Sequence, residues 1–99
     1  MLNEEIIKWC REEWPKRTLE SVERKLLEET QELRDAIHKK DELNTKEELF
    51  DAYAMIVDYC FMHNIDLQKL FEAKKEIIEH RKLWGKMPNQ EKEILRRYL

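Results

Sequence analysis

The scarcity of glycine and proline is the feature that most constrains the fold of this chain. Its 99 residues include one Gly and two Pro, whereas β-rich architectures need many such residues in their turns. We therefore expect an all-α protein, and the length suits a single domain over residues 1–99. A chain this short buries only a modest share of its surface, so self-association would help to complete the fold.

The charge balance excludes several classes of function. Charged residues make up 41% of the chain, and 19 basic against 22 acidic residues give a net charge of −3 without any basic block, which disfavours binding to DNA or RNA. No apolar run approaches the ~20 residues that span a membrane. The acidic N-terminus is unlike a signal peptide. We expect a cytoplasmic protein (host cytoplasm, if phage-encoded) in which Cys10 and Cys60 are reduced packing residues.

The periodicity of apolar residues predicts four helices and a short fifth one. Their expected ranges are residues 2–13, 19–39, 45–63, 67–83 and 90–98. Thr18 is the expected N-cap of the second helix. Residues 40–44 are expected to form a polar loop, after which Thr45 and Glu48 have the spacing of a capping box that starts the third helix. Gly85 and Pro88 are expected to end the fourth helix.

Carboxylates interrupt the most apolar parts of this pattern. Residues 49–62 read LFDAYAMIVDYCFM, so we expect the third helix to be buried on all sides, yet it carries Asp51 and Asp58. Glu29 stands on the apolar seam of the second helix. An ionised carboxylate in such a place is costly unless it is paired or binds a metal.

The spacing of these carboxylates predicts a shared cation. Glu29 and Glu32 lie three positions apart on one helix, as do Glu48 and Asp51 on the next. On facing antiparallel helices these four groups would repel one another unless a divalent cation lay among them, and oxygen ligands suit Mg²⁺. Asp58 lies seven residues after Asp51, ~10 Å along the axis, so we expect it to meet another part of a ligand.

A plainer interpretation is ordinary surface charge. Glu48 would then only cap its helix. The glutamates of the preceding helix would be solvated or paired with Lys25 and Arg24, namely Glu28, Glu29 and Glu32. That interpretation suits one helix alone. The coincidence of two acidic pairs with aspartates in an apolar run favours the cation site.

Two motifs resemble those of the MazG-like all-α nucleoside triphosphate pyrophosphatases. Residues 25–33, KLLEETQEL, resemble the motif K-L-x-E-E-x-x-E-L, and residues 47–51, EELFD, resemble E-E-L-x-D. The resemblance covers residues 14–86, and residues 14–18 with Asp58 look most like the dATP/dGTP diphosphohydrolase-like branch.

The end of the matched segment departs from the family pattern. Lys74, Arg81 and Trp84 resemble the closing motif K-x₃-N-x₂-R-x-W, but Ile78 stands in place of the usual Asn and one extra residue precedes Trp84. Asn64 replaces the usual Gly of the turn before the fourth helix. These departures concern contacts with the base and sugar and leave the metal site intact.

The resemblance implies hydrolysis of (deoxy)nucleoside triphosphates between the α- and β-phosphates, with a possible preference for deoxypurines. It implies a four-helix bundle that carries a short extra C-terminal helix. Because the third helix is apolar on every side, we expect a homodimer or a tetramer built from dimers to complete this bundle, with the active site near the subunit interface. Mg²⁺, or Mn²⁺ as a substitute, would be held by Glu29, Glu32, Glu48 and Asp51. The implied catalytic residues are Glu28, Glu29 and Glu32, and the implied substrate-binding residues are Lys25, Asp58, Lys74, Arg81 and Trp84.

Other classes of function remain open from the residues alone. A charged helical bundle also suits a non-catalytic adaptor or regulatory protein. A carboxylate-bridged iron or manganese bundle usually contains Glu-x-x-His, which this chain lacks. Trp9, Trp14 and Trp84 could stack on a base, although packing is the more common role of tryptophan. The three histidines lack metal-ligand spacing, and we assign them no role.

Overall fold

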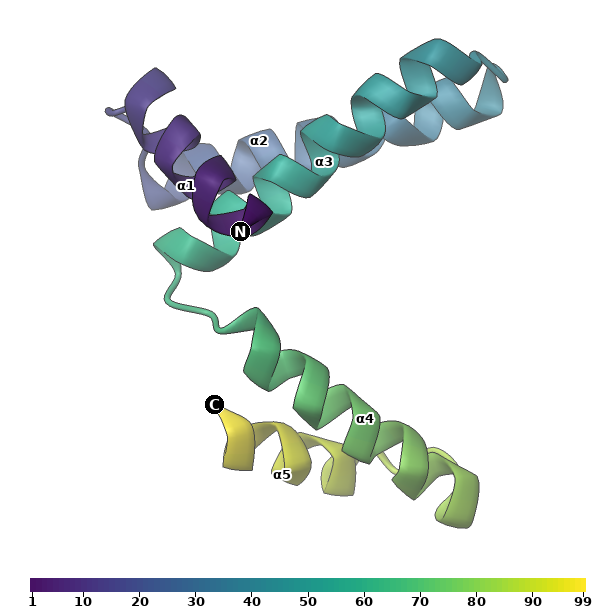
Figure 1. Ribbon diagram of the computed structural model, residues 1–99. Helices are drawn as coiled ribbons and strands as arrows, with labels where there is room; N and C mark the ends of the chain where they lie inside the picture. The colour runs from purple at the N-terminus through teal and green to yellow at the C-terminus, as the bar shows by residue number, and fades with distance from the viewer. The chain divides into compact units, whose positions relative to one another are not determined.

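A computed structural model describes residues 1–99 and contains only helices. The helices are α1 (Leu2–Glu13), α2 (Leu19–His38), α3 (Glu42–Met62), α4 (Leu67–Trp84) and α5 (Pro88–Tyr98) (Figure 1). The all-α class predicted from the sequence is therefore confirmed. None of the five helices has both the length and the apolar character needed to cross a bilayer.

The chain divides into two compact units. The first spans residues 1–64 and contains α1 to α3, and the second spans residues 65–99 and contains α4 and α5. That residues 1–99 act as one domain, and that oligomerisation completes a four-helix bundle, stay predictions.

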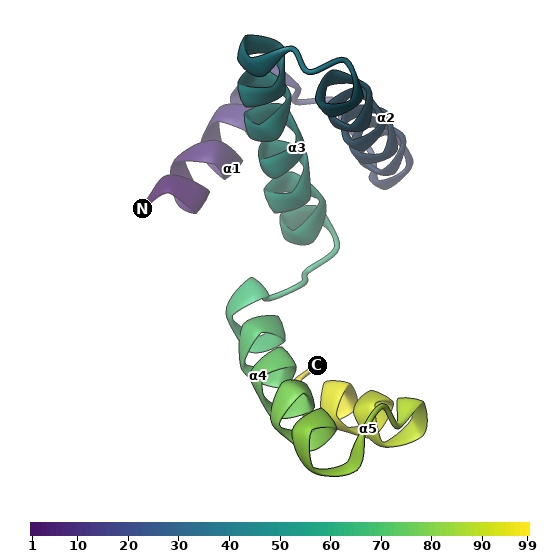
Figure 2. The same ribbon diagram turned by 90° about the vertical axis from the view of Figure 1, so that its right-hand side faces the viewer.

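In the first unit, α2 and α3 form an antiparallel hairpin, and α1 packs against α3 (Figures 1 and 2). The core joins Ile6 and Cys10 of α1 to Ala54, Met55 and Val57 of α3. Removal of this apolar surface from water, worth about 25 cal/mol per Å², stabilises the unit.

Residue Thr18 caps α2 as expected. Its hydroxyl accepts a hydrogen bond from the Ser21 amide at 3.0 Å, and the Ser21 hydroxyl accepts one from the Thr18 amide at 2.8 Å. This reciprocal pair satisfies two amides that a helix start leaves without partners.

The start of α3 differs from the expectation. The capping box predicted at Thr45 is wrong: α3 begins at Glu42, and the Asp41 carboxylate accepts the hydrogen bond from the Asn44 amide at 3.1 Å. Lys40 adopts a left-handed φ of 55°, which closes the α2–α3 connection within a few residues in place of the expected loop. Glu48 therefore lies in the second turn of α3, where capping does not use its carboxylate.

The expectation that α3 is buried on all sides is also wrong within one chain. Phe50, Tyr53, Ile56 and Phe61 each keep 40–48% of their surface exposed. A three-helix unit has too few neighbours to cover every face of its central helix.

In the second unit, Asp66 caps α4 by accepting hydrogen bonds from the amides of Gln68 and Lys69 at 2.9 and 3.2 Å. Gly85 ends α4 with a φ of 74°, a backbone conformation that favours glycine. The expectation that Pro88 ends α4 is wrong. Pro88 is the first residue of α5, at a position where a helix needs no amide donor.

Candidate active site

Three of the four predicted metal ligands converge on the seam between α2 and α3. Glu29 of α2 and Glu48 and Asp51 of α3 each offer a carboxylate oxygen, and these oxygens all lie within 4.8 Å of one another. Glu29 is buried at 6% exposure, and the other two are half-buried. We call these three residues the acidic cluster. One helical turn separates Glu48 from Asp51, so both face α2 from the same side of α3.

Glu32 lies one turn beyond Glu29 on α2 and is exposed. It is outside the set of mutually close oxygens. The charge of Glu29 raises the pKa of Glu32, and the charge of Glu32 in turn contributes to the raised pKa of Glu48. Glu32 therefore borders the acidic cluster electrostatically.

Burial and mutual repulsion change the ionisation of the cluster. Burial, followed by the negative charges of Glu32, Glu29 and Asp51, raises the pKa of Glu48 to about 7. Burial and the charge of Glu29 also raise the pKa of Asp51. These shifts indicate that the site holds more negative charge than the protein itself balances.

Lys25 is the cation that meets this cluster. Its Nζ lies 2.9 Å from Oε1 of Glu29 and 3.8 Å from Oε1 of the exposed Glu28, and the hydrogen bond to Glu29 raises the pKa of Lys25. One lysine does not neutralise three carboxylates.

The unpaired oxygens of the cluster fit a divalent cation. Oε2 of Glu29 and Oε2 of Glu48 are shielded from solvent and have no hydrogen-bond partner in the protein. Burying a carboxylate oxygen without a partner is unfavourable. Because the donors are carboxylate oxygens only, they suit a hard cation such as Mg²⁺ or Mn²⁺.

A surface cavity of about 530 Å³ lies where the α1–α2 connector meets the start of α2. We call it the connector cavity. It is lined by Glu13, Trp14, Pro15, Lys16, Arg17, Ser21 and Lys25. Lys25 also binds Glu29, so the cavity and the acidic cluster share a residue. The cavity has the size of a small-molecule site and offers an aromatic surface beside cations.

Asp58 lies apart from the acidic cluster in an ion pair with two arginines. It is 0% exposed, and its carboxylate accepts hydrogen bonds from Arg11 at 2.5 and 2.6 Å and from Arg17 at 2.7 Å. The sequence carries no signal for this pairing, because the arginines stand 47 and 41 positions away. A direct contact between Asp58 and substrate stays a prediction.

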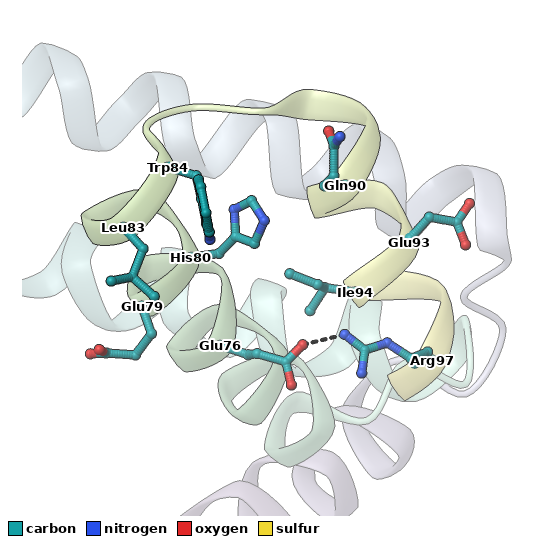
Figure 3. Close-up of a pocket in the computed structure, with 9 residues that line it drawn as sticks. All are labelled: Glu76, Glu79, His80, Leu83, Trp84, Gln90, Glu93, Ile94 and Arg97. Carbon is teal, nitrogen blue, oxygen red and sulfur yellow. Dashed lines mark hydrogen bonds and ion pairs between the residues drawn. The ribbon is translucent and has the colours of Figure 1, made fainter.

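The remaining predicted substrate-binding residues belong to the second unit. Arg81 donates two hydrogen bonds to Glu91 of α5, at 3.1 and 2.7 Å, a pairing that no sequence motif predicts. Lys74 is exposed and forms no ion pair. Trp84 is 69% exposed and lines a cavity of about 480 Å³ between α4 and α5, with His80 and Ile94 (Figure 3).

Fold and site together define a small all-helical protein in which a two-helix seam presents carboxylates suited to a divalent cation. The family model of the MazG nucleotide pyrophosphohydrolase domain matches residues 17–84, and the chain belongs to this family. The match spans α2 to α4 and so includes the whole acidic cluster. Comparisons with curated proteins and with solved structures gave no match.

Proposed function

We propose that this protein adds water across the α–β phosphoanhydride bond of nucleoside triphosphates, which yields a monophosphate and pyrophosphate. The observation that carries the proposal is the pair of shielded oxygens on Glu29 and Glu48, which lack a partner at the centre of a MazG domain. An ordinary structural ion pair would have satisfied them.

The cation would be held by Glu29, Glu48 and Asp51, with Glu32 as the fourth ligand from the adjacent turn of α2. We propose Mg²⁺, with Mn²⁺ as a substitute, because the donors are all oxygens. A divalent cation bound here would neutralise phosphate charge and help to activate water for attack.

The protein's own groups supply orientation and proton transfer in this proposal. Lys25 stands between the acidic cluster and the connector cavity, where its ammonium group can bind a phosphate oxygen. Glu28, Glu29 and Glu32 are the candidates to accept a proton from water. Among them Glu28 is solvent-exposed and weakly paired, so it is free to receive that proton.

The connector cavity is the proposed place for the nucleoside part of the substrate. The indole of Trp14 offers a surface for a base, and Lys25 leads from the cavity to the carboxylates. A preference for deoxypurines is supported by the resemblance of residues 14–18 to the dATP/dGTP diphosphohydrolase-like branch.

Binding of substrate by the second unit is proposed for Lys74, Arg81 and Trp84. Lys74 is available to an anion, since it forms no ion pair. Arg81 would have to leave the carboxylate of Glu91 to bind a phosphate, so Glu91 competes with the substrate for its guanidinium.

We also propose that the chain forms a homodimer or a tetramer built from two such dimers. The exposed apolar side chains of α3 support this, because surfaces of that kind commonly mark interfaces. Light scattering at micromolar concentration tests it, and a monomeric mass would refute it.

The proposed activity is tested by incubating the protein with eight common NTPs and dNTPs, with Mg²⁺ or with a chelator, and separating the products. We expect monophosphate and pyrophosphate in equal amounts, only when Mg²⁺ is present. Release of inorganic phosphate and a diphosphate would show cleavage at the wrong bond. Absence of all products would favour a non-catalytic interaction protein.

A further inference from the structure

We propose that Asp58 is a positioning residue, which fixes the wall of the connector cavity through Arg17 and thereby sets how the nucleoside part of the substrate is bound. This inference rests on the proposed function, because it concerns the same substrate. It replaces a direct contact between Asp58 and substrate with an indirect one.

The carboxylate of Asp58 is closed to a direct contact with a ligand. Its side chain is fully buried on α3, and both carboxylate oxygens are already engaged by Arg11 and Arg17. A substrate hydroxyl or amino group has no solvent-accessible surface of Asp58 to approach. Any influence of this carboxylate on a ligand must pass through its arginine partners.

Arg17 connects Asp58 to the connector cavity. Its side chain is only 6% exposed, and its guanidinium donates a hydrogen bond to Asp58 at 2.7 Å. The same guanidinium lies over the ring of Trp14, 4.5 Å from the ring centroid. Both Arg17 and Trp14 line the connector cavity. The buried carboxylate of Asp58 therefore fixes the guanidinium of Arg17, which in turn contacts the ring of Trp14 in the cavity wall.

The contact with Arg17 restricts the side chain of Trp14. Trp14 is 40% exposed and lies in the connector that follows α1. Its other aromatic contact is edge-on to Trp9, with ring centroids 5.1 Å apart. The cation–π contact with the immobilised Arg17 and the contact with Trp9 together restrict the ring more than either contact would alone. A fixed wall lowers the ordering cost that a bound ligand must meet.

The two arginines provide a matched comparison. Both bind Asp58, yet Arg17 lines the cavity and Arg11 does not. Arg11 lies instead over the ring of Phe61, at 5.9 Å. If Asp58 only stabilised the fold, the loss of either arginine would have the same kind of effect. A positioning role requires that the two losses differ in ligand binding.

The experiment compares Arg17→Met with Arg11→Met, because Asp58→Asn would leave two arginines unpaired and could prevent folding. Binding of nucleoside monophosphates is measured by calorimetry in the presence of a chelator, and KM and kcat are measured with Mg²⁺. We expect Arg17→Met to weaken monophosphate binding and raise KM by about tenfold, with kcat changed less than about twofold. Arg11→Met should leave binding and KM within about twofold, although thermal denaturation should show both variants destabilised.

A spectroscopic measurement separates positioning from stability. The near-ultraviolet circular dichroism of the Trp9–Trp14 pair should weaken in Arg17→Met and persist in Arg11→Met. Equal effects of the two variants on monophosphate binding, or no monophosphate binding by the unmodified protein, would overturn the inference. The binding assay needs neither metal nor turnover. Loss of binding in Arg17→Met alone therefore supports the inference even where no pyrophosphate is released, a result that would contradict only the proposed function.

Discussion

Glu29 on α2 and Glu48 on α3 bring carboxylate oxygens within 4.8 Å of each other, and each group also has one shielded oxygen without a hydrogen-bond partner. Two like charges in this arrangement repel each other, and burial adds to the cost of ionising them. The raised pKa of Glu48 expresses that cost. A bound cation would remove the repulsion and provide the missing partner.

Without metal, the stability of the protein should fall as pH rises from about 4.5 to about 7. The folded state raises the pKa of Glu48 from an ordinary 4.5 to about 7, so the folded protein binds a proton more tightly than the unfolded chain. That contribution is fully present below the ordinary pKa and is lost as pH rises through the raised one. Thermal denaturation in a chelator at pH 4.5, 6 and 8 measures it.

The same experiment with Mg²⁺ should show the opposite trend, since the cation binds the ionised carboxylates and adds most stability above pH 7. The variant Glu48→Gln should lose both effects. Glu23→Gln, which changes an exposed glutamate of α2 outside the cluster, should keep them. A Mg²⁺ stabilisation in Glu48→Gln equal to that of the unmodified protein would contradict this assignment.

The start of α3 can be tested by removing each of its two candidate caps. Asp41→Ala should lower the free energy of unfolding by about 1 kcal/mol, because the Asn44 amide loses its acceptor. Thr45→Ala should cost less, since the Thr45 hydroxyl only donates to the Asp41 carbonyl within the helix, at 2.7 Å. Urea denaturation compares the two variants. A larger loss in Thr45→Ala would place the helix start where the sequence pattern predicted it.

Local patterns in the sequence predicted most of the helices. Apolar periodicity, with the cap at Thr18, was sufficient for α1, α2 and α4, because these signals depend on residues close in the chain. The start of α3 was predicted wrongly because Asp41 and Thr45 are both good cap residues only four positions apart. The left-handed turn at Lys40, directly before the cap residue Asp41, has no clear sequence signal.

The site shows the same division between local and distant information. The spacing of Glu48 and Asp51 on one helix, and the place of Glu29 on the seam of another, predicted the convergence that the structure contains. The pairing of Asp58 with Arg11 and Arg17 joins distant segments, so only the packing of α1 on α3 reveals it.

In the second unit, Glu91 should hold α5 against α4 at neutral pH and release it in acid. The Arg81 guanidinium and the Met87 amide lower the pKa of Glu91 to about 2. A lowered pKa stabilises the folded state above the ordinary value of 4.5, and this contribution is lost as pH falls from about 4.5 toward 2. Hydrogen exchange of the α5 amides should accelerate, relative to the intrinsic rate, over that range.

The variant Glu91→Gln should show fast exchange in α5 already at pH 7. Glu93→Gln is the matched control, since Glu93 is exposed and pairs with Arg96 within the same helix. Equal protection of α5 in both variants would mean that apolar packing around Ile94 alone holds the helix.

The most direct test of the whole account is the rate of pyrophosphate release by Asp51→Asn in saturating Mg²⁺. Asp51 belongs to the acidic cluster, and its replacement by a neutral side chain of equal size removes one charged ligand with little change in packing. We predict that the rate falls by about 100-fold or more, whereas Glu23→Gln stays within about twofold of the unmodified protein. Pyrophosphate release by a folded Asp51→Asn at the unmodified rate would contradict a metal-dependent active site at the α2–α3 seam.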